Sequence, residues 1–473
     1  MQVLFHNGNK TCITKLINPI YKESVMVNKK LIRELLSESD CSHNKTKKSS
    51  CDKPKPGATS GGCAFEGAQI SLFPFADVIH LVHSPATCIG ASWETRQTLT
   101  SHHGENNTVM GYTTDVNTND IIFGGDKKLE ESINYIVEHK NPKGIFVYET
   151  CVTAMIGDDM DNVCGRMEKK HGIPIIVIHS PGFVGGKNLG SRLSGESVLH
   201  QLIGTREPEE IHPFGINLIG EYNVTGDMWQ YTPLLEKIGI KIISTLAGDG
   251  RIENIQMAHT AKLNVIVCAK SLISLTRKMQ EQYQIPYISI SFYGKRDTTN
   301  AIRSIVNAFG DEALSARAEA LIAEEEAKLE EALIPYKKIL EGKKAILNTG
   351  GNKTWSIASA LQDIGINVVA TSVQKATLED KEICAQYVKI LITDPGTQQA
   401  QLIDEHNVDI LLAGGRSLYT AIKKKVAFVD VNQEKKVSYG AYSGLVNLAI
   451  DVANAVNNRV FKVVGTNAPW ESN

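Results

Sequence analysis

The 473-residue chain is 42% hydrophobic and 22% charged, which is typical of a globular protein and excludes a disordered tail or a small disulfide-stapled domain. Its 50 Lys and Arg residues nearly balance its 52 Asp and Glu residues, so no net field favours nucleic acid or an anionic membrane as a partner. No segment approaches the roughly 20 consecutive apolar residues that cross a bilayer.

Residues 1–62 are expected to form an N-terminal extension and a polar arm rather than a packed domain. The first 25 residues lack the apolar h-region of a secretory signal, which favours the cytoplasm, and Met26 is a candidate start of translation. Residues 27–36 have the apolar spacing of a short helix. Residues 37–62 are rich in Lys, Pro and Gly and carry too few apolar side chains to pack a core.

Short runs of Ile, Val and Leu alternate with helical patterns after residue 62. Most of these runs are continuously apolar, as strands covered on both faces are, and their alternation with helices predicts βαβ units and parallel sheets. The fold class is therefore predicted to be α/β, with three Rossmann-like domains and mostly parallel sheets. The predicted strands are 144–148, 175–178, 216–219, 241–245, 263–267, 287–290, 344–347, 367–370, 389–392, 408–412 and 426–429.

The predicted domain boundaries follow the same pattern. The α/β domains are expected at 63–215, 216–340 and 341–473. The second should end in a long helix at 313–340, rich in Ala, Glu, Lys and Leu and interrupted only by Pro335. Glycine-rich turns follow several predicted strands, but neither Gly-x-Gly-x-x-Gly after a strand nor Gly-x-x-x-x-Gly-Lys-Ser/Thr is present, so these turns do not indicate a nucleotide site.

The nine cysteines are not expected to form a disulfide framework, because the cytoplasmic thiol pool would keep them reduced. Cys63 is flanked by glycines, Cys88 follows an apolar run, and Cys151 follows the predicted strand 144–148. Iron–sulfur clusters require thiolate ligands. If these three bind one cubane cluster, a fourth ligand is missing and a partner chain would supply it. The alternative is that each thiol is only a small packed side chain.

A competing site would hold zinc near the polar arm. Cys41, His43, Cys51 and Cys63 supply the thiolates and the imidazole of a tetrahedral zinc site. Their separations exceed those of the tight knuckles in zinc fingers, which counts against this alternative.

Cys268 differs from the other thiols because it follows the apolar run of the predicted strand 263–267. Its sulfur would project into a central crevice, where parallel sheets bind their ligands, and Lys270 adds a positive charge for an anionic ligand. Cys164 and Cys384 fall in helical patterns and are expected to be packed or partly exposed thiols.

Several motifs, in order along the chain, resemble the nitrogenase component 1 superfamily, and within it the scaffold subunits on which the iron-molybdenum cofactor is assembled. The resemblance runs from about Asn28 to Trp470 and implies a fold with a central metallocluster crevice. Its strongest segments are CSHNK at 41–45, KPKPGAT at 53–59, GGC at 61–63, Cys151 with IGDD at 156–159, KNLG at 187–190, GTREP at 204–208, NLIGEYN at 217–223 and DVNQE at 430–434.

The resemblance implies one resident cluster and one visiting cluster. Cys63, Cys88 and Cys151 match the positions that ligate a [4Fe-4S] cluster at the scaffold's subunit interface, with the fourth thiolate from the partner. In the nitrogenase α-subunit the same positions hold half of the P-cluster. Cys268 matches the position that holds an iron-sulfur-carbide precursor of the iron-molybdenum cofactor while molybdenum and homocitrate are installed.

The resemblance also implies partners. Family members of this type pair with a NifN-like subunit in a heterotetramer with two copies of each chain. They receive the precursor from a NifB-type protein, work with the nitrogenase iron protein, and prepare the cofactor for apo-nitrogenase component 1. These roles describe a cytoplasmic assembly scaffold rather than a turnover catalyst, with neither nucleic acid nor membrane as a partner.

Two departures separate a scaffold from a catalyst. The nitrogenase α-subunit ligates the molybdenum end of the cofactor with a His where this chain has Asn432, and an amide is a poor ligand compared with imidazole. Where the α-subunit has a catalytic His after Leu-Gly, this chain has Ser191. Arg96, Lys270 and Lys353 could neutralise an anionic cluster and homocitrate without bonding to metal, which suits a ligand that must leave.

Three other functions agree with parts of the pattern. A catalytic component 1 α-type subunit would need the ligands that Asn432 and Ser191 replace. A nucleotide-linked α/β enzyme would bind phosphate at the glycine turns, and its cysteines would only pack. A relative that reduces a tetrapyrrole ring would share the fold and the interface cluster, but gives no reason for the motifs at 204–208 and 430–434.

Overall fold

The computed structural model describes residues 62–93, 98–101, 111–267, 272–374, 376, 378–432 and 436–464. These residues belong to two compact units. The first unit lies within Asp52–Val224 and Gly239–Ser289, and the second within Thr225–Ile238 and Ile290–Asn473. None of the described helices combines the length and the apolar character of a membrane span. The predicted helix at 27–36 lies outside the described residues.

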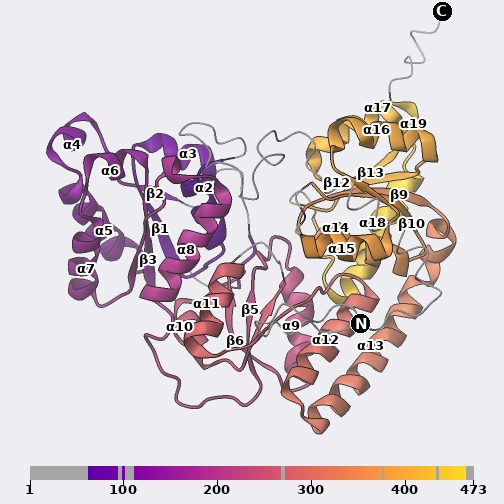
Figure 1. Ribbon diagram of the computed structural model, residues 1–473, viewed down its shortest axis with the longest axis horizontal. Helices are drawn as coiled ribbons and strands as arrows, with labels where there is room; N and C mark the ends of the chain where they lie inside the picture. The colour runs from indigo at the N-terminus through magenta and orange to yellow at the C-terminus, as the bar shows by residue number, and fades with distance from the viewer. Residues whose placement is uncertain are drawn as a thin grey trace, which may run out of the picture. The chain divides into compact units, whose positions relative to one another are not determined.

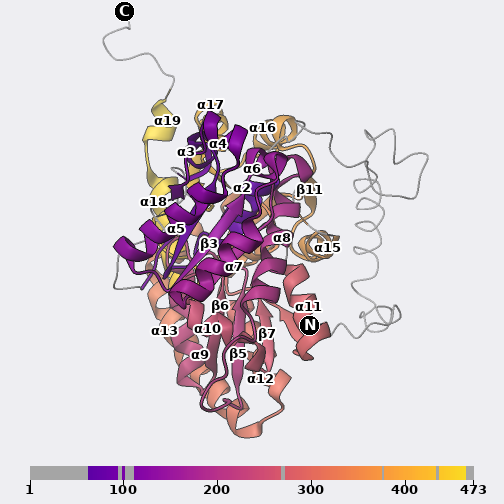
Figure 2. The same cartoon turned by 90° about the vertical axis from the view of Figure 1, so that its left-hand side faces the viewer.

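The first sheet of the first unit has four parallel strands in the order β2-β1-β3-β4. Helices α5 and α7 pack on one face of it, and α2 and α8 on the other (Figures 1 and 2). This double cover explains the continuously apolar strand sequences. The elements are α2 (Ala64–Leu72), β1 (Val78–His83), α3 (Ala86–Trp93), β2 (Tyr112–Thr113), α4 (Thr118–Phe123), α5 (Asp126–Lys140), β3 (Gly144–Glu149), α6 (Cys151–Ile156), α7 (Met160–His171), β4 (Ile175–Ile178), η2 (Gly182–Val184) and α8 (Lys187–Gln201).

The second sheet of the first unit is also parallel, in the order β6-β5-β7-β8. Its side chains and those of α10 and α11 join the same apolar core as α2 and α8, so the two sheets share one interior. The elements are β5 (Gly215–Ile219), β6 (Lys241–Leu246), α10 (Ile252–Gln256), η3 (Ala258–Thr260), β7 (Leu263–Ile266), α11 (Ile273–Tyr283) and β8 (Tyr287–Ser289).

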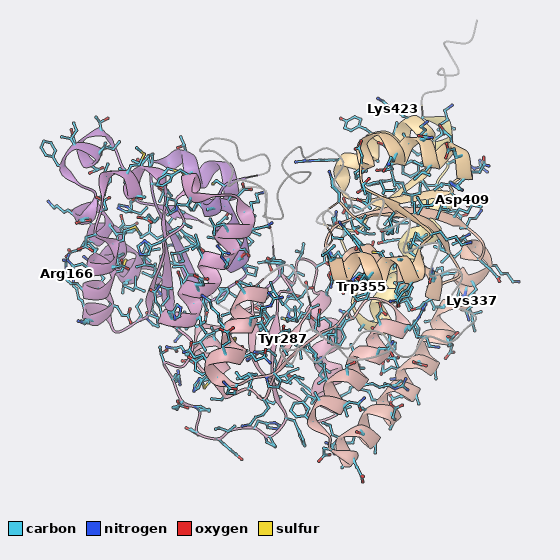
Figure 3. All side chains as sticks on the ribbon, viewed as in Figure 1. Arg166, Tyr287, Lys337, Trp355, Asp409 and Lys423 are labelled. Atoms are coloured by element: carbon cyan, nitrogen blue, oxygen red, sulfur yellow. The ribbon has the colours of Figure 1, made fainter. Side chains whose placement is uncertain are left out.

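The second unit contains a five-stranded parallel sheet in the order β11-β10-β9-β12-β13. Figure 3 labels Trp355 on α14, whose indole N–H donates to Asp380 of α15 at 3.0 Å. Helix α13 continues through Pro335. The elements are α9 (Asp227–Lys237), α12 (Lys295–Phe309), α13 (Glu312–Leu340), β9 (Lys344–Asn348), α14 (Lys353–Asp363), β10 (Asn367–Ser372), α15 (Leu378–Tyr387), β11 (Ile390–Ile392), α16 (Pro395–His406), β12 (Ile410–Ala413), η4 (Gly415–Ser417), α17 (Leu418–Lys424), β13 (Ala427–Asp430), α18 (Ala441–Asn457) and α19 (Val460–Val463).

The predicted α/β class with parallel sheets is confirmed, but β1 and β2 are absent from the predicted strands. β1 was missed because His80 and His83 interrupt its apolar sequence, although both side chains are buried. His80 remains neutral, since burial lowers its pKa to about 3, and its Nδ1 pairs with the Tyr148 hydroxyl at 2.8 Å. The partner that makes this burial tolerable comes from β3, which no local sequence pattern reveals.

Each sheet has a switch point, where successive connections leave in opposite directions. It lies between β1 and β3 in the first sheet, between β5 and β7 in the second, and between β9 and β12 in the third. Loops at the carboxyl ends of these strand pairs diverge and leave a crevice, which is where open α/β sheets bind their ligands.

Candidate metal centre

Cys88 and Cys151 follow the two strands that flank the first switch point. β1 ends at His83, with Cys88 in the first turn of α3, and β3 ends at Glu149, with Cys151 as the first residue of α6. His83 and Glu149 are register partners in the sheet. The strand order therefore brings both cysteines to the same edge, although they are far apart in the sequence.

Cys63 reaches this edge through α2 and α8. It is the N-cap residue of α2 and forms an isolated antiparallel bridge with Gly186, directly before α8. The two helices pack closely because glycines lie at the contact. A Cβ at Gly67 would lie 2.0 Å from the Lys187 carbonyl oxygen.

Gly182 is the residue at which two of the sulfurs meet. A Cβ added there would lie 3.0 Å from the Cys151 sulfur and 3.2 Å from the Cys63 sulfur. Gly182 is itself buried in η2. A side chain at this position would crowd both thiols, so the glycine leaves the space beside them open.

Cys88 belongs to the same group of thiols. Burial raises the pKa of the Cys88 thiol, and the adjacent Cys151 and Cys63 sulfurs raise it further because a thiolate at Cys88 would be repelled by theirs. All three thiols are half-buried and none forms a disulfide. A bound metal would reverse this preference for the neutral thiol, because metal-coordinating thiols are deprotonated.

This donor set fits an iron–sulfur cluster better than a single ion. Among the described residues, no three His, Cys, Asp or Glu side chains are close enough to hold one metal ion. A [4Fe-4S] cluster attaches each thiolate to a different iron, so its ligands stand farther apart than those of one zinc ion. Three half-buried thiols beside a glycine provide both the ligands and the room.

Two other described cysteines differ from this group. Cys164 packs with the core on the α5 and α7 face of the first sheet, and Cys384 is buried in the second unit. Burial raises the pKa of each thiol to about 12. Both are packed, as predicted, so neither offers an accessible thiol as a metal ligand.

Charged side chains beside the cysteines were not identified as site residues from the sequence. Lys187 forms an ion pair with Glu66 at 2.6 Å, one turn into α2 from Cys63. His179 contacts Glu149 and Asp161, each at 3.1 Å, and these hydrogen bonds raise its pKa to about 9. The KNLG motif contains Lys187, but its ion pair with Glu66 depends on the contact between α2 and α8, which the sequence alone does not reveal.

Lys353 and Asn432 lie in the second unit. The Lys353 ammonium lies over the Tyr293 ring, 5.6 Å from its centroid. Asn432 follows β13, its backbone N–H donates to Asp430 at 2.8 Å, and a Cβ at Gly414 would lie 2.9 Å from its side-chain nitrogen. Both residues therefore lie near the carboxyl edge of the third sheet, beyond β9 and β13.

Ser191, which the resemblance matches to a catalytic His of the nitrogenase α-subunit, lies in the first unit. Its hydroxyl is hydrogen-bonded to the Ser71 hydroxyl of α2 at 2.5 Å. The other predicted site residues lie outside the described residues. They are Cys268 and the two cations Arg96 and Lys270, predicted to hold the precursor, and Cys41, His43 and Cys51 of the alternative zinc site.

A family model described as "Nitrogenase component 1 type Oxidoreductase" matches residues 63–457. The chain belongs to this family. The match begins at Cys63 and includes all three cysteines around Gly182.

Members of the nitrogenase component 1 family called "Nitrogenase iron-molybdenum cofactor biosynthesis protein NifE" are similar over most of the chain. Those of Nostoc sp., Rippkaea orientalis and Klebsiella pneumoniae are 48%, 47% and 42% identical and align with 93% of this chain and 93%, 95% and 99% of their own lengths. The predicted resemblance to members of the family that are named for biosynthesis of the iron-molybdenum cofactor is thus confirmed. A solved structure described as "Nitrogenase Cp1 at pH 5" matches 87% of this chain and 91% of its own with a TM-score of 0.76 at 27% identity, which confirms the fold.

Proposed function

We propose that this chain is a scaffold subunit for assembly of the nitrogenase iron-molybdenum cofactor. It would hold a resident [4Fe-4S] cluster through Cys63, Cys88 and Cys151, and bind an iron-sulfur-carbide precursor as its cargo through Cys268. The observation that supports the proposal most is that the Cys63 and Cys151 sulfurs meet beside Gly182, close enough to Cys88 for both to raise the pKa of its thiol. The relatives called NifE support the role in cofactor biosynthesis.

The fourth thiolate would come from a NifN-like partner subunit in a heterotetramer with two copies of each chain. Apolar side chains are exposed on the elements that carry or contact the cysteines: Met155 of α6 is 78% exposed and Phe183 of η2 is 42% exposed. Large apolar side chains beside an incomplete ligand set are what a covering subunit would bury. The resident cluster would supply one-electron transfer at this interface.

The cargo would be held by one thiolate and by charge. Cys268 is the proposed thiolate, and Arg96, Lys270 and Lys353 would neutralise the anionic precursor and homocitrate. Asn432 provides no imidazole, so the precursor would lack the second anchor that it has in a catalytic subunit. A NifB-type protein would deliver the precursor, the nitrogenase iron protein would assist the installation of molybdenum, and apo-nitrogenase component 1 would receive the product.

A catalytic nitrogenase α-type subunit is the second candidate, because the fold matches that of a nitrogenase. Ser191 counts against it, since its hydroxyl is paired with Ser71 and a serine is not an acid of imidazole type. Acetylene reduction by the purified complex at rates comparable with nitrogenase would favour the catalytic candidate over the scaffold.

The test is iron analysis and electron paramagnetic resonance spectroscopy of the partner-bound complex, purified without oxygen. Replacement of Cys63, Cys88 or Cys151 by Ala should remove the resident cluster signal, and Cys384→Ala, which removes a packed thiol of the other unit, should preserve it. Cys268→Ala should preserve the same signal but lose bound precursor. An iron-free wild-type complex would refute the proposal.

A further inference from the structure

The segment between β1 and α3, which leads to Cys88, and the helix that begins with Cys151 are joined through one buried histidine. His83, the last residue of β1, has no exposed side-chain surface, and Asp158, after α6, is only 2% exposed. The His83 Nε2 lies 2.9 Å from Asp158 Oδ2, and the His83 Nδ1 lies 2.9 Å from the Thr114 hydroxyl. The imidazole thus contacts both the loop after α6 and the segment after β2.

The Thr114 hydroxyl lies 2.9 Å from the His83 Nδ1 and 3.5 Å from the Ser84 carbonyl oxygen, so the protonation of the ring decides which of the two accepts the hydroxyl proton. Burial lowers the pKa of His83, against the opposing effect of Asp158, so the ring is neutral and carries one N–H. Its Nε2–H donates to the Asp158 carboxylate, and its Nδ1 accepts from the Thr114 hydroxyl. The Thr114 oxygen in turn accepts from the Ser84 backbone N–H at 3.2 Å. Every polar atom of the imidazole is used, which makes each partner costly to remove.

The backbone of His83 is bound to the segment on both sides of Cys151. The Thr150 hydroxyl donates to the His83 carbonyl oxygen at 2.9 Å, and the Thr153 hydroxyl donates to the same oxygen at 3.1 Å. Both threonines are buried. The residue before Cys151 and the residue two positions after it are therefore fixed to the strand that leads to Cys88.

Asp158 extends the network to the start of α5. Its Oδ1 accepts from the Gly125 backbone N–H at 2.8 Å. A Cβ at Gly125 would lie 2.5 Å from the Asp158 carboxylate and 3.0 Å from the His83 ring. Only a residue without a side chain therefore lets the backbone at position 125 lie this close to the carboxylate and the imidazole. His83 and Asp158 together thus join the segments that contain Thr114, Gly125 and the end of α6.

We propose that His83 and Asp158 are positioning residues that fix the separation of the Cys88 and Cys151 sulfurs for the resident cluster. The inference rests on the proposed function, because it assigns the two residues a role toward a cluster held by those thiols. One oxygen of the Asp158 carboxylate accepts from His83 and the other from Gly125, so Asp158→Asn would turn an amide N–H₂ against one of these two N–H donors. Either outcome would disturb the segments that carry both cysteines.

The experiment compares Asp158→Asn with Asp404→Asn, which changes an exposed aspartate of α16 that is paired with Lys424. The partner-bound complexes are purified without oxygen, and iron content, the resonance spectrum of the reduced cluster, the rate of iron loss to a chelator and the thermal midpoint are measured. Asp158→Asn should shift the spectrum and lose iron roughly 10- to 100-fold faster, the usual effect of removing a partner behind a metal ligand. Asp404→Asn should match the wild type.

A second pair of variants decides the matter if Asp158→Asn does not fold. Thr114→Val removes the hydroxyl that His83 accepts from and keeps the shape, whereas Thr114→Ser keeps the hydroxyl. Faster iron loss and an altered spectrum in Thr114→Val, with wild-type behaviour in Thr114→Ser, would support the inference. Variants that lower the thermal midpoint but leave the spectrum and the iron-loss rate unchanged would overturn it. A wild-type complex without iron would instead overturn the proposed function.

Discussion

The carboxyl edges of the first and third sheets each contain a switch point, but their side chains differ. At the first edge, the imidazole and the carboxylate next to the cysteines are fully engaged in hydrogen bonds. At the third edge, the Thr349 hydroxyl and the Gln399 amide nitrogen are buried without a hydrogen-bond partner among the described residues. The hydrogen bonds of His83 and Asp158 are thus satisfied within the first edge, whereas these two polar groups of the third edge are not. The strand order determines where a binding site can lie, and the side chains at that edge determine which ligand it binds.

The largest expected difference between the edges comes from adding one methyl group to each. Gly182→Ala places a carbon 3.0 Å from the Cys151 sulfur, and we expect roughly tenfold faster iron loss from the resident cluster because a ligand must move. Gly414→Ala meets only the end of the Asn432 side chain, at 2.9 Å, which can rotate away, so cluster iron should not change. Iron-release kinetics measure both effects. Gly165→Ala, in open space on α7, is the control, and equal release rates in all three variants would contradict the comparison.

An imidazole introduced at the third edge should slow the dissociation of the precursor. Asn432→His supplies a ligand that binds metal better than an amide, so we expect the precursor to dissociate from the complex roughly tenfold more slowly. Transfer of radioactive iron from the loaded complex to apo-nitrogenase component 1 would measure this. Asn432→Gln, which keeps an amide, should retain the wild-type rate. A release rate from Asn432→His equal to that of the wild type would show that Asn432 does not face the cargo.

The smallest effect concerns a surface histidine at the first edge. Because hydrogen bonds from the His179 imidazolium to Glu149 and Asp161 raise its pKa from 6.5 to about 9, the folded protein binds the extra proton between these pH values and the unfolded chain does not. Stability from this group is therefore complete below pH 6.5 and is lost as the pH rises through about 9. The loss should not exceed about 1 kcal/mol, since the group is half-exposed and screened.

Thermal midpoints measured across this pH range test the prediction. The wild-type midpoint should fall more steeply than that of His179→Gln, and Asp161→Asn, which keeps the Glu149 contact, should give an intermediate slope. Identical slopes in the wild type and His179→Gln would mean that the pair is not formed in solution.

The parallel α/β fold could be predicted because most of the buried strands are visible in the sequence as continuous runs of apolar residues. The strands 175–178 and 344–347 were predicted with at most one residue of error, against Ile175–Ile178 and Lys344–Asn348. The positions of Cys63, Cys88 and Cys151 in the sequence left a packed role open, and their assignment as cluster ligands came from the resemblance to the family and stays a prediction. Neither the role of Gly182 nor that of Asp158 could be predicted, since each depends on contacts between segments that only the tertiary fold brings together. The roles of Arg96, Cys268 and Lys270, and the domain boundaries, stay predictions.

The backbone contact between α2 and α8 has a mechanical consequence. A Cβ at Gly190 would lie 1.8 Å from the Ala64 carbonyl oxygen, so the helices touch main chain to main chain and have no side-chain cushion between them. The pair must shift as a single rigid body, because neither helix can slide without a collision. A displacement of Cys63, which caps α2, would consequently be transmitted to α8 at this contact.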